Sequence, residues 1–427
     1  MAATRFPPGP PPAPDYYRWR AHVFLVVYIG YVFAYTTRNN LKVVSARFVE
    51  EEGWSLYQVG FVLSAFTLAY GAGKIIFGMV ADRVSLRRLF GGALIISGIL
   101  CILTGIPSSA RTIASLTFAN GLVQSALAPA ALVLLGAWYP NSSRGSRVAI
   151  WNTSQNLGAA LLPLLAGAFT GWSLARFHIF LIPGLLTIAV GIWAYRTGAD
   201  RPWRQGLPTL TMIFGPAGTP QLSTRADGYW PTVVRAVLTN RWILTLVGIN
   251  TLLYCIRFGV INWVVIFAAA HTAGRTGEIA LAGAELAAIP ASFAFGAYAA
   301  RHPNRASSAA MKSMLALAVA LAAWPHLAFS SSSVAGALLL GALIYGPQVS
   351  INMLTLSLVP DNVAGAATGV VGAAGYLAGE TLANFLIPHL VTGYGWTVAY
   401  TSLALTALIC AAGYASLRGP EMRSLRY

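Results

Sequence analysis

Four basic residues stand inside long apolar runs of the sequence: Arg38, Lys42, Lys74 and Arg257. A charged side chain at the centre of a bilayer costs at least about 2.5–3.5 kcal/mol, so cations placed there require a polar cavity. A planar guanidinium presents five donors in a fork that matches phosphate or carboxylate oxygens, and it stays protonated at physiological pH. These residue types therefore indicate a buried anion-binding site.

Each of the two arginines follows a tyrosine by three residues and shares a helical face with further polar side chains. The first pattern has spacings of 4, 3 and 4 residues and consists of Tyr31, Tyr35, Arg38 and Lys42. The second pattern has spacings of 4 and 3 residues and consists of Asn250, Tyr254 and Arg257. Such pairing is expected of parallel repeats with a site at their interface near mid-membrane. We interpret the arginines as a clamp for one tetrahedral dianion, with Lys74 adding a mobile charge.

In an alternative interpretation, each arginine pairs with a buried acid and only holds helices together. Two acids, Glu285 and Glu380, lie well inside apolar runs, which leaves the embedded groups with a net charge of +2. An unpaired surplus in a low dielectric needs water or an anion to offset it. A phosphate monoester carries about −1.5 to −2 near pH 7, so the balance favours an anionic cargo.

The rest of the sequence is typical of a multi-spanning membrane protein. Of 427 residues, 56% are hydrophobic and 9% are charged, whereas a soluble domain has about 25% charged residues. This composition excludes a soluble enzyme, a disordered chain and a disulfide-rich secreted domain. The three cysteines lie in apolar runs and are interpreted as small core residues. The proline-rich start of the chain is a polar lead-in rather than a cleavable signal peptide.

Apolar runs predict an all-α membrane protein with twelve spans in two six-helix bundles. The expected spans are 21–45, 57–80, 87–106, 111–138, 147–170, 177–196, 240–269, 277–300, 307–329, 334–358, 363–391 and 395–417. We expect an N-terminal segment at 1–20, bundles at 21–196 and 239–418, a central loop at 197–238 and a tail at 419–427.

Basic residues of the connecting segments are unevenly distributed between the two sides of the expected bundle. One side holds 20 of them, and the other holds Arg47, Arg111, Arg176 and Arg275. The positive-inside rule therefore predicts that both termini are cytoplasmic. The formal net charge of +16 then follows from topology, and no nucleic-acid partner is expected.

Several segments resemble motifs of known transporters. GMVADR, at Gly78 to Arg83, looks like the loop motif of the major facilitator superfamily. Further segments, spread from about Tyr17 to Arg418, resemble the organophosphate:phosphate antiporter family: YTTRNN around Arg38, AYGAGKIIFG around Lys74, RGSRVAIWNTSQNLG from Arg144, RFGVINW from Arg257, IYGPQ from Ile344 and AGAATGVVGAAGYLAG from Ala364.

The resemblance implies a major facilitator fold and exchange of an organic phosphate for inorganic phosphate by alternating access. By position it implies that Arg38 and Arg257 bind phosphate and that Lys74 is the family's second-span lysine. It also implies that tyrosines surround the pathway, namely Tyr31, Tyr35, Tyr254, Tyr345 and Tyr376.

Two residues depart from the family pattern. Asn39 stands where members commonly carry lysine, and Gln155 stands where they often carry histidine. Lys42, one turn beyond Arg38 on the same face, is a candidate to replace the missing lysine. Gln155 stays a candidate substrate contact, but it cannot titrate near pH 7.

The cargo that we favour is a sugar phosphate such as hexose 6-phosphate or glycerol 3-phosphate. A transporter-like sensor of sugar phosphate and a proton-coupled carrier of organic anions, with Glu285 or Glu380 as proton carriers, stay open as alternatives. An enzyme is disfavoured, because GAGK at Gly71 to Lys74 lacks the spacing of a phosphate loop. We expect a monomer in the lipid bilayer, in the inner membrane if bacterial, without cofactor or metal.

Overall fold

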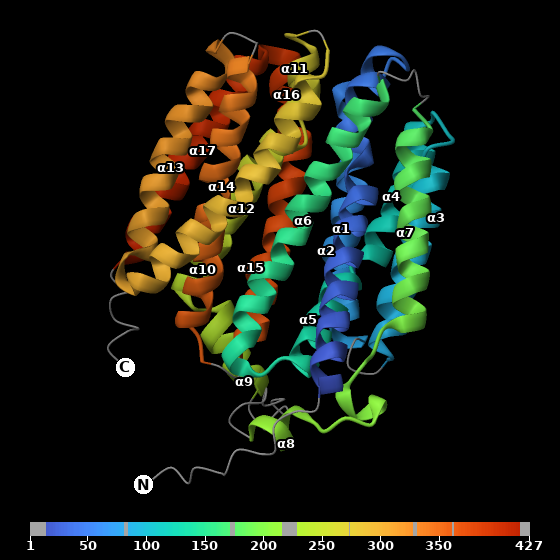
Figure 1. Ribbon diagram of the computed structural model, residues 1–427. Coiled ribbons are helices and arrows are strands. Elements are labelled where there is room, and N and C mark those ends of the chain that lie inside the picture. Colours follow the sequence, from blue (N-terminus) through green and yellow to red (C-terminus); the bar gives the residue numbers. More distant parts are fainter. Residues whose placement is uncertain are drawn as a thin grey trace.

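The computed structural model describes residues 14–80, 84–170, 176–215, 229–272, 274–327, 331–360 and 363–418. These residues form helices and turns and contain no strand, as the sequence predicts. The N-terminal half, blue to green in Figure 1, lies beside the C-terminal half, yellow to red. The start of α1 and the end of α17 lie at one end of the molecule, which we call the terminal end; the opposite end is the distal end (Figure 1).

The N-terminal half consists of seven helices, of which α4 and α5 follow each other as one interrupted rod. Its helices are α1 (Pro14–Glu50), α2 (Leu56–Val80), α3 (Leu86–Thr104), α4 (Ala110–Gln124), α5 (Leu127–Trp138), α6 (Asn141–Thr170) and α7 (His178–Thr197). The segment that follows contains short helical pieces: η2 (Pro202–Gln205), α8 (Leu210–Phe214), α9 (Tyr229–Val233) and η4 (Val234–Leu238).

The C-terminal half repeats this order, with one rod interrupted after Ile261 and another that contains a π-helical turn. Its elements are α10 (Arg241–Ile261), α11 (Val264–Ala269), α12 (Thr276–Arg301), η5 (Pro303–Arg305), α13 (Ala306–Ala323), η6 (Trp324–His326), α14 (Ser331–Ser357), α15 (Ala364–Ala374), η8 (Gly375–Glu380), α16 (Thr381–Tyr394) and α17 (Trp396–Ser416).

Ten helical segments of the described residues are long and apolar enough to cross a membrane. Two more helices, α1 with 37 residues and α6 with 30 residues, are long enough but carry more polar and charged side chains. These two helices pack against each other. The count of twelve spans stays a prediction in which α1 and α6 are the polar members.

The helices of the structure begin and end within a few residues of most expected spans. The largest differences are at α1, which extends beyond 21–45 at both ends, at α6, which begins at Asn141 rather than at 147, and at α13, which ends at Ala323 rather than at 329. Apolarity marks where a helix enters lipid, whereas a helix continues into water as long as its backbone hydrogen bonds and side chains permit. This difference explains the longer helices.

In each half, one glycine allows a neighbouring helix to pack closely against the helix that carries the arginine. A Cβ added to Gly158 of α6 would lie 2.2 Å from a carbonyl oxygen of α1 and 2.8 Å from the Cβ of Tyr35. A Cβ added to Gly379 of η8 would lie 2.2 Å from a carbonyl oxygen of α10 and 2.8 Å from the Cβ of Tyr254. Since each tyrosine stands three residues before its arginine, the two halves are built on one internal repeat.

The halves are in close contact at the distal end, where α2 begins and α16 ends. A Cβ on Gly60 of α2 would lie 1.9 Å from the carbonyl oxygen of Asn384 in α16. Close by, the hydroxyl of Tyr57 and Nδ1 of His389 lie 3.2 Å apart. The backbones of α2 and α16 therefore touch, and this contact joins the two halves on the distal side.

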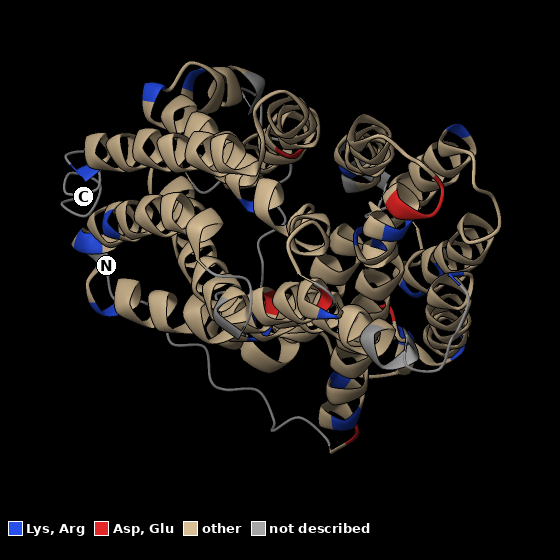
Figure 2. Ribbon diagram, turned by 90° about the horizontal axis from the view of Figure 1, so that it is seen from above, with Lys and Arg blue, Asp and Glu red and all other residues tan. Residues whose placement is uncertain are grey.

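Some predictions from the sequence fall outside the described residues. Residues 81–83 of the GMVADR segment, the chain before residue 14 and the tail after residue 418 are among them. The three cysteines are described, and each is buried with a free thiol, in agreement with their interpretation as core residues. Charged residues are sparse along the helices when the molecule is viewed along its axis (Figure 2).

Candidate functional site

Arg38 lies in α1 among aromatic rings rather than beside an acid. Its Cζ atom lies 4.3 Å from the ring centroid of Tyr70, 4.6 Å from that of Phe66 and 5.1 Å from that of Tyr35. Its Nη1 donates a hydrogen bond of 3.2 Å to the hydroxyl of Tyr35. The negative faces of the rings stabilise the cation without neutralising it. Within the described residues, Arg38 has no carboxylate at ion-pair distance.

Tyr376, from the opposite half, lies between the cations of the N-terminal half and the tyrosine of α10. Its ring lies 4.5 Å from Nζ of Lys74 and 5.6 Å from Cζ of Arg38. The same ring packs 5.2 Å from the ring of Tyr70 and 5.0 Å from the ring of Tyr254. Tyr376 therefore connects the two halves at the level of the arginines.

Arg257 of α10 is held by hydrogen bonds. Its Nη1 donates to Oε1 of Gln348 at 3.1 Å, and its Nη2 donates to the hydroxyl of Tyr345 at 2.7 Å. Tyr345 in turn donates to Oε2 of Glu285 at 2.7 Å, and Nε2 of Gln348 donates to the hydroxyl of Tyr254 at 3.1 Å. Arg257 is thus linked to a carboxylate through one hydroxyl group.

Glu285 also bonds across the interface between the halves. Nδ2 of Asn156 in α6 donates to the same Oε2 atom of Glu285 at 2.7 Å. Glu285 is 4% exposed, and its Oε2 atom accepts both of these hydrogen bonds inside the protein. Nε of Arg257 has no hydrogen-bond partner among the described residues. The guanidinium therefore keeps one buried donor for a guest.

The other predicted site residues lie around this arrangement. Tyr31 packs against Tyr35 and, with ring centroids 4.6 Å apart, against Trp151. Gln155 accepts a hydrogen bond of 3.1 Å from the hydroxyl of Tyr35. Lys42 is buried, and its Nζ lies 5.2 Å from the ring of Phe258 in the opposite half.

Contacts therefore connect every predicted site residue into one cluster at the interface of the halves. The predicted members are Tyr31, Tyr35, Arg38, Lys42, Lys74, Gln155, Tyr254, Arg257, Tyr345 and Tyr376. Four further members, Phe66, Trp151, Asn156 and Phe258, were not identified from the sequence. None of them has a side chain of a type that signals anion binding.

Other polar residues at helical spacing have structural roles. Ser97 donates a hydrogen bond of 2.8 Å to Asn120, and Gln124 donates to Ser97 at 2.8 Å and to Thr37 at 3.0 Å. These bonds join α1, α3 and α4 inside the N-terminal half. Hydrogen bonds of this kind between helices stabilise the packing of a membrane bundle.

The ion pairs among the described residues do not include the four embedded cations. These pairs are Arg18–Asp15, Arg176–Glu52 and Arg204–Asp200. Within the described chain, neither arginine therefore forms the ion pair with a buried acid that the alternative interpretation requires. A search of the same residues finds no group of three or more side chains that could hold a metal ion.

The chain is similar to several known proteins. Residues 27–380 match the profile of the Major Facilitator Superfamily. The chain is similar to the hexose-6-phosphate:phosphate antiporter of Salmonella typhimurium, with 26% identity over 94% of this chain and 91% of that protein. It is similar to the membrane sensor protein UhpC of Escherichia coli, with 28% identity over 93% of this chain and 91% of that protein.

The fold is similar to that of a solved bacterial homologue of the human lysosomal transporter Spinster, in an inward-facing and unoccupied conformation. The TM-score is 0.71, with 16% identity over 96% of this chain and 99% of that chain. At this identity the likeness concerns the fold alone.

Proposed function

Because the chain belongs to the Major Facilitator Superfamily, we propose that it exchanges an organic phosphate for inorganic phosphate by alternating access. The observation that carries this proposal is the pair of guanidinium groups, buried at Arg257 and half-buried at Arg38, that come one from each half and have no ion-pair partner among the described residues. A tetrahedral dianion accepts several charge-assisted hydrogen bonds at once, and two forks from opposite helices fit it.

In this mechanism the phosphate group binds between Arg38 and Arg257. Its oxygens accept hydrogen bonds from both guanidinium groups and replace part of the aromatic contact around Arg38. Lys74 adds a point charge. The bound anion draws the halves together, so the loaded carrier reorients.

The empty carrier reorients slowly, because its cations lack compensation in a low dielectric. Slow return without an anion enforces exchange rather than net flow. The step from one facing state to the other opens the contact of Tyr57 with His389 at the distal end.

The rest of the cargo faces amide and hydroxyl groups. Gln155 and Gln348 lie within hydrogen-bond distance of the tyrosines beside each arginine. Such groups suit the hydroxyls of a sugar or glycerol phosphate. We propose a monomer with both termini in the cytoplasm, in the inner membrane of a bacterium, since most basic residues of the connecting loops lie on the side of the termini.

The test is phosphate counterflow in proteoliposomes that contain the purified full-length protein. Vesicles loaded with inorganic phosphate should take up labelled phosphate from outside, and glucose 6-phosphate, glycerol 3-phosphate or phosphoglycerate should compete. Vesicles without internal phosphate should take up little. Uptake driven by a pH gradient without internal phosphate would contradict exchange and would support a proton-coupled carrier.

A sensor is a second candidate function, favoured by the 28% identity to the membrane sensor protein UhpC. A sensor binds the phosphate ligand without moving it. Binding of glucose 6-phosphate in detergent, measured by calorimetry, together with absent counterflow would support the sensor and contradict the antiporter.

A further inference from the structure

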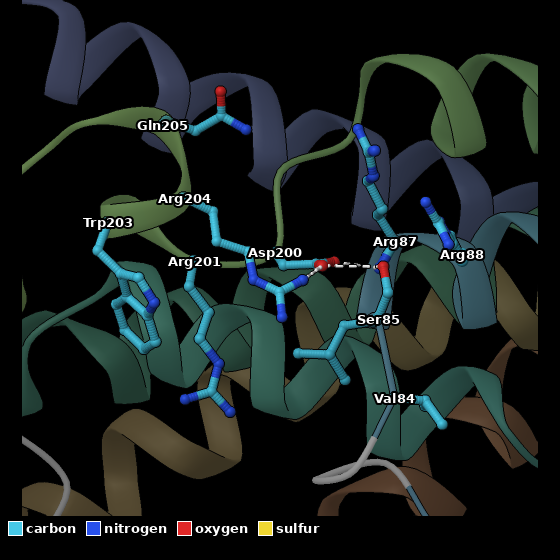
Figure 3. Close-up of a pocket in the computed structure, with 10 residues that line it drawn as sticks. Val84, Ser85, Arg87, Arg88, Asp200, Arg201, Trp203, Arg204 and Gln205 are labelled. Atoms are coloured by element: carbon cyan, nitrogen blue, oxygen red, sulfur yellow. Dashed lines mark hydrogen bonds and ion pairs between the residues drawn. The ribbon is translucent and has the colours of Figure 1, made fainter.

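A basic cavity lies at the terminal end of the N-terminal half, apart from the arginine cluster. It has a volume of about 670 Å³ and lies between the start of α3 and the chain that follows α7 (Figure 3). Among the described residues, four arginines and one aspartate line it, which gives this lining a net charge of +3. The arginines are Arg87, Arg88, Arg201 and Arg204, and the aspartate is Asp200.

The aspartate of this cavity is fully engaged by its neighbours. Oδ1 of Asp200 accepts a hydrogen bond of 2.7 Å from the backbone N–H of Arg87, in the first turn of α3. Its Oδ2 accepts from the hydroxyl of Ser85 at 2.8 Å and from Nη1 of Arg204 at 2.7 Å. Asp200 therefore caps α3, and its charge is compensated by Arg204 and by the helix dipole.

Among the described residues, three arginines of the lining have no carboxylate partner, and of these Arg87 donates a hydrogen bond of 3.4 Å to the carbonyl oxygen of Gly198. Figure 3 shows Arg204 directed at Asp200, whereas Arg88 and Arg201 point away from it. Within the described part of the chain, neither Arg88 nor Arg201 has a carboxylate at ion-pair distance. The guanidinium of Arg201 lies 5.0 Å from the ring of Trp203, which is 50% exposed. These two cations are available to an anion.

A membrane crossed by α3 and α7 puts the cavity at the depth of lipid headgroups. α3 and α7 are both apolar enough to cross a membrane, and the cavity stands where α3 begins and α7 ends. Tryptophan and arginine are the residues that favour this interface. A neighbouring cavity of about 500 Å³ shares Arg87 and Gln205 and adds Trp19 and Arg196 to the same basic and aromatic edge.

Apolar surface continues from the cavity along the two helices. Ile96 and Ile99 of α3 are 48% and 45% exposed, and Ile192 and Tyr195 of α7 are 38% and 43% exposed. An acyl chain can follow such a surface while its headgroup stays at the end of the helices. A soluble phosphate gains nothing from it.

We propose that this cavity binds the phosphate headgroup of an anionic phospholipid, with Arg201 as the phosphate contact beside Trp203 and with Arg88 attracting the headgroup from the other side of Asp200. Trp203 lies at the rim, between the headgroup and the acyl chains. Because Asp200 already ties the start of α3 to the chain after α7, a bound headgroup strengthens the joint between the N-terminal bundle and the central segment.

Native mass spectrometry of the full-length protein in mild detergent tests this proposal. The protein is titrated with phosphatidylglycerol, with phosphatidylcholine and, in a separate arm, with inorganic phosphate. We expect the wild-type protein to retain phosphatidylglycerol in preference to phosphatidylcholine. The double variant R88Q/R201Q should bind phosphatidylglycerol about 30-fold more weakly, since each removed cation near the headgroup contributes about a fivefold gain.

The matched control is R305Q/K312Q, which removes two cations that line a cavity of about 550 Å³ at the same end of the C-terminal half. It should leave the tightly held lipid in place, and R88K/R201K should retain most of it. Phosphate counterflow by R88Q/R201Q shows that this variant is folded. Equal phosphatidylglycerol affinity in wild type and R88Q/R201Q would overturn the proposal. Displacement of the lipid by equimolar inorganic phosphate would overturn it as well and would assign the cavity to a soluble anion.

Discussion

Arg38 and Arg257 occupy equivalent places in the two halves, but their surroundings differ. Arg38 is surrounded by rings and donates one hydrogen bond, to Tyr35. Arg257 donates to Tyr345 and Gln348, and Tyr345 connects it to the carboxylate of Glu285. One internal repeat therefore supports two different ways of holding a cation at the interface of the halves.

This difference indicates how readily each arginine can bind an anion. Aromatic faces stabilise a cation but leave its hydrogen-bond donors free, so an anion adds to Arg38 with little to displace. At Arg257, an anion competes with hydroxyl and amide acceptors that are already in place. We infer that Arg38 is the first contact of the phosphate group, and that Arg257 exchanges partners when the halves close.

The largest effect is expected from replacing the two guanidinium groups by the ammonium group of lysine. R38K and R257K should each reduce phosphate counterflow roughly 100-fold, because an ammonium cannot donate the two parallel hydrogen bonds of a guanidinium. The measurement is initial exchange velocity at equal amounts of reconstituted protein. If one variant kept full activity, the anion would not be bound by both halves.

The matched control for these variants is R305K, which changes an exposed arginine at the terminal end. R305K makes the same change from guanidinium to ammonium as R38K and R257K, and it also keeps the positive charge. We expect its exchange velocity to equal that of the wild type.

The shared repeat predicts equal effects from two alanine substitutions. G158A and G379A each place a Cβ 2.2 Å from a carbonyl oxygen of the arginine-bearing helix. Each should lower the free energy of unfolding by about 1–3 kcal/mol, despite the better helix propensity of alanine. The measurement is thermal unfolding in detergent.

G92A is the control for this pair, because a Cβ on Gly92 of α3 meets nothing within 4 Å. It should be neutral or stabilising. A loss of stability in G158A without one in G379A would show that the halves do not share this packing.

Glu285 allows the electrostatic difference between the halves to be measured. E285Q removes one negative charge near Arg257, while its amide oxygen still accepts hydrogen bonds from Tyr345 and Asn156. We expect the Kd for inorganic phosphate, measured by calorimetry, to fall about tenfold, since an opposing charge is removed from a low-dielectric site.

The control is E278Q, which removes an acid from the first turn of the same helix. It should leave the Kd unchanged. Weaker phosphate binding in E285Q would mean that Glu285 positions Arg257 and does not oppose the anion.

Much of this arrangement could be predicted from the sequence, because charge inside apolar runs is rare and costly. Arg38, Lys42, Lys74 and Arg257 are identified by that cost alone, and the repeated spacing of tyrosine and arginine indicates two related halves. The positions of most helices could be predicted too, because a segment that crosses lipid must be apolar along most of its length.

The different environments of the two arginines could not be predicted in this way. Phe66 and Phe258 are ordinary apolar residues in ordinary apolar helices, and only the fold brings them to a cation. Asn156 meets Glu285 across an interface between segments 129 residues apart. Spacing along one helix cannot reveal a partner on another helix.

The smallest effect is expected from removing one ring on each side. F66L takes away a face that lies 4.6 Å from Cζ of Arg38, and F258L takes away a face that lies 5.0 Å from Cζ of Arg257. F66L should raise the KM for phosphate about threefold, because Arg38 depends on rings. F258L should change the KM less than about twofold, because Arg257 keeps its hydrogen bonds to Tyr345 and Gln348. Leucine keeps both positions apolar, so unequal KM values would report the cation contact rather than packing. Equal changes in the two variants would contradict the distinction between a ring-held and a hydrogen-bonded arginine.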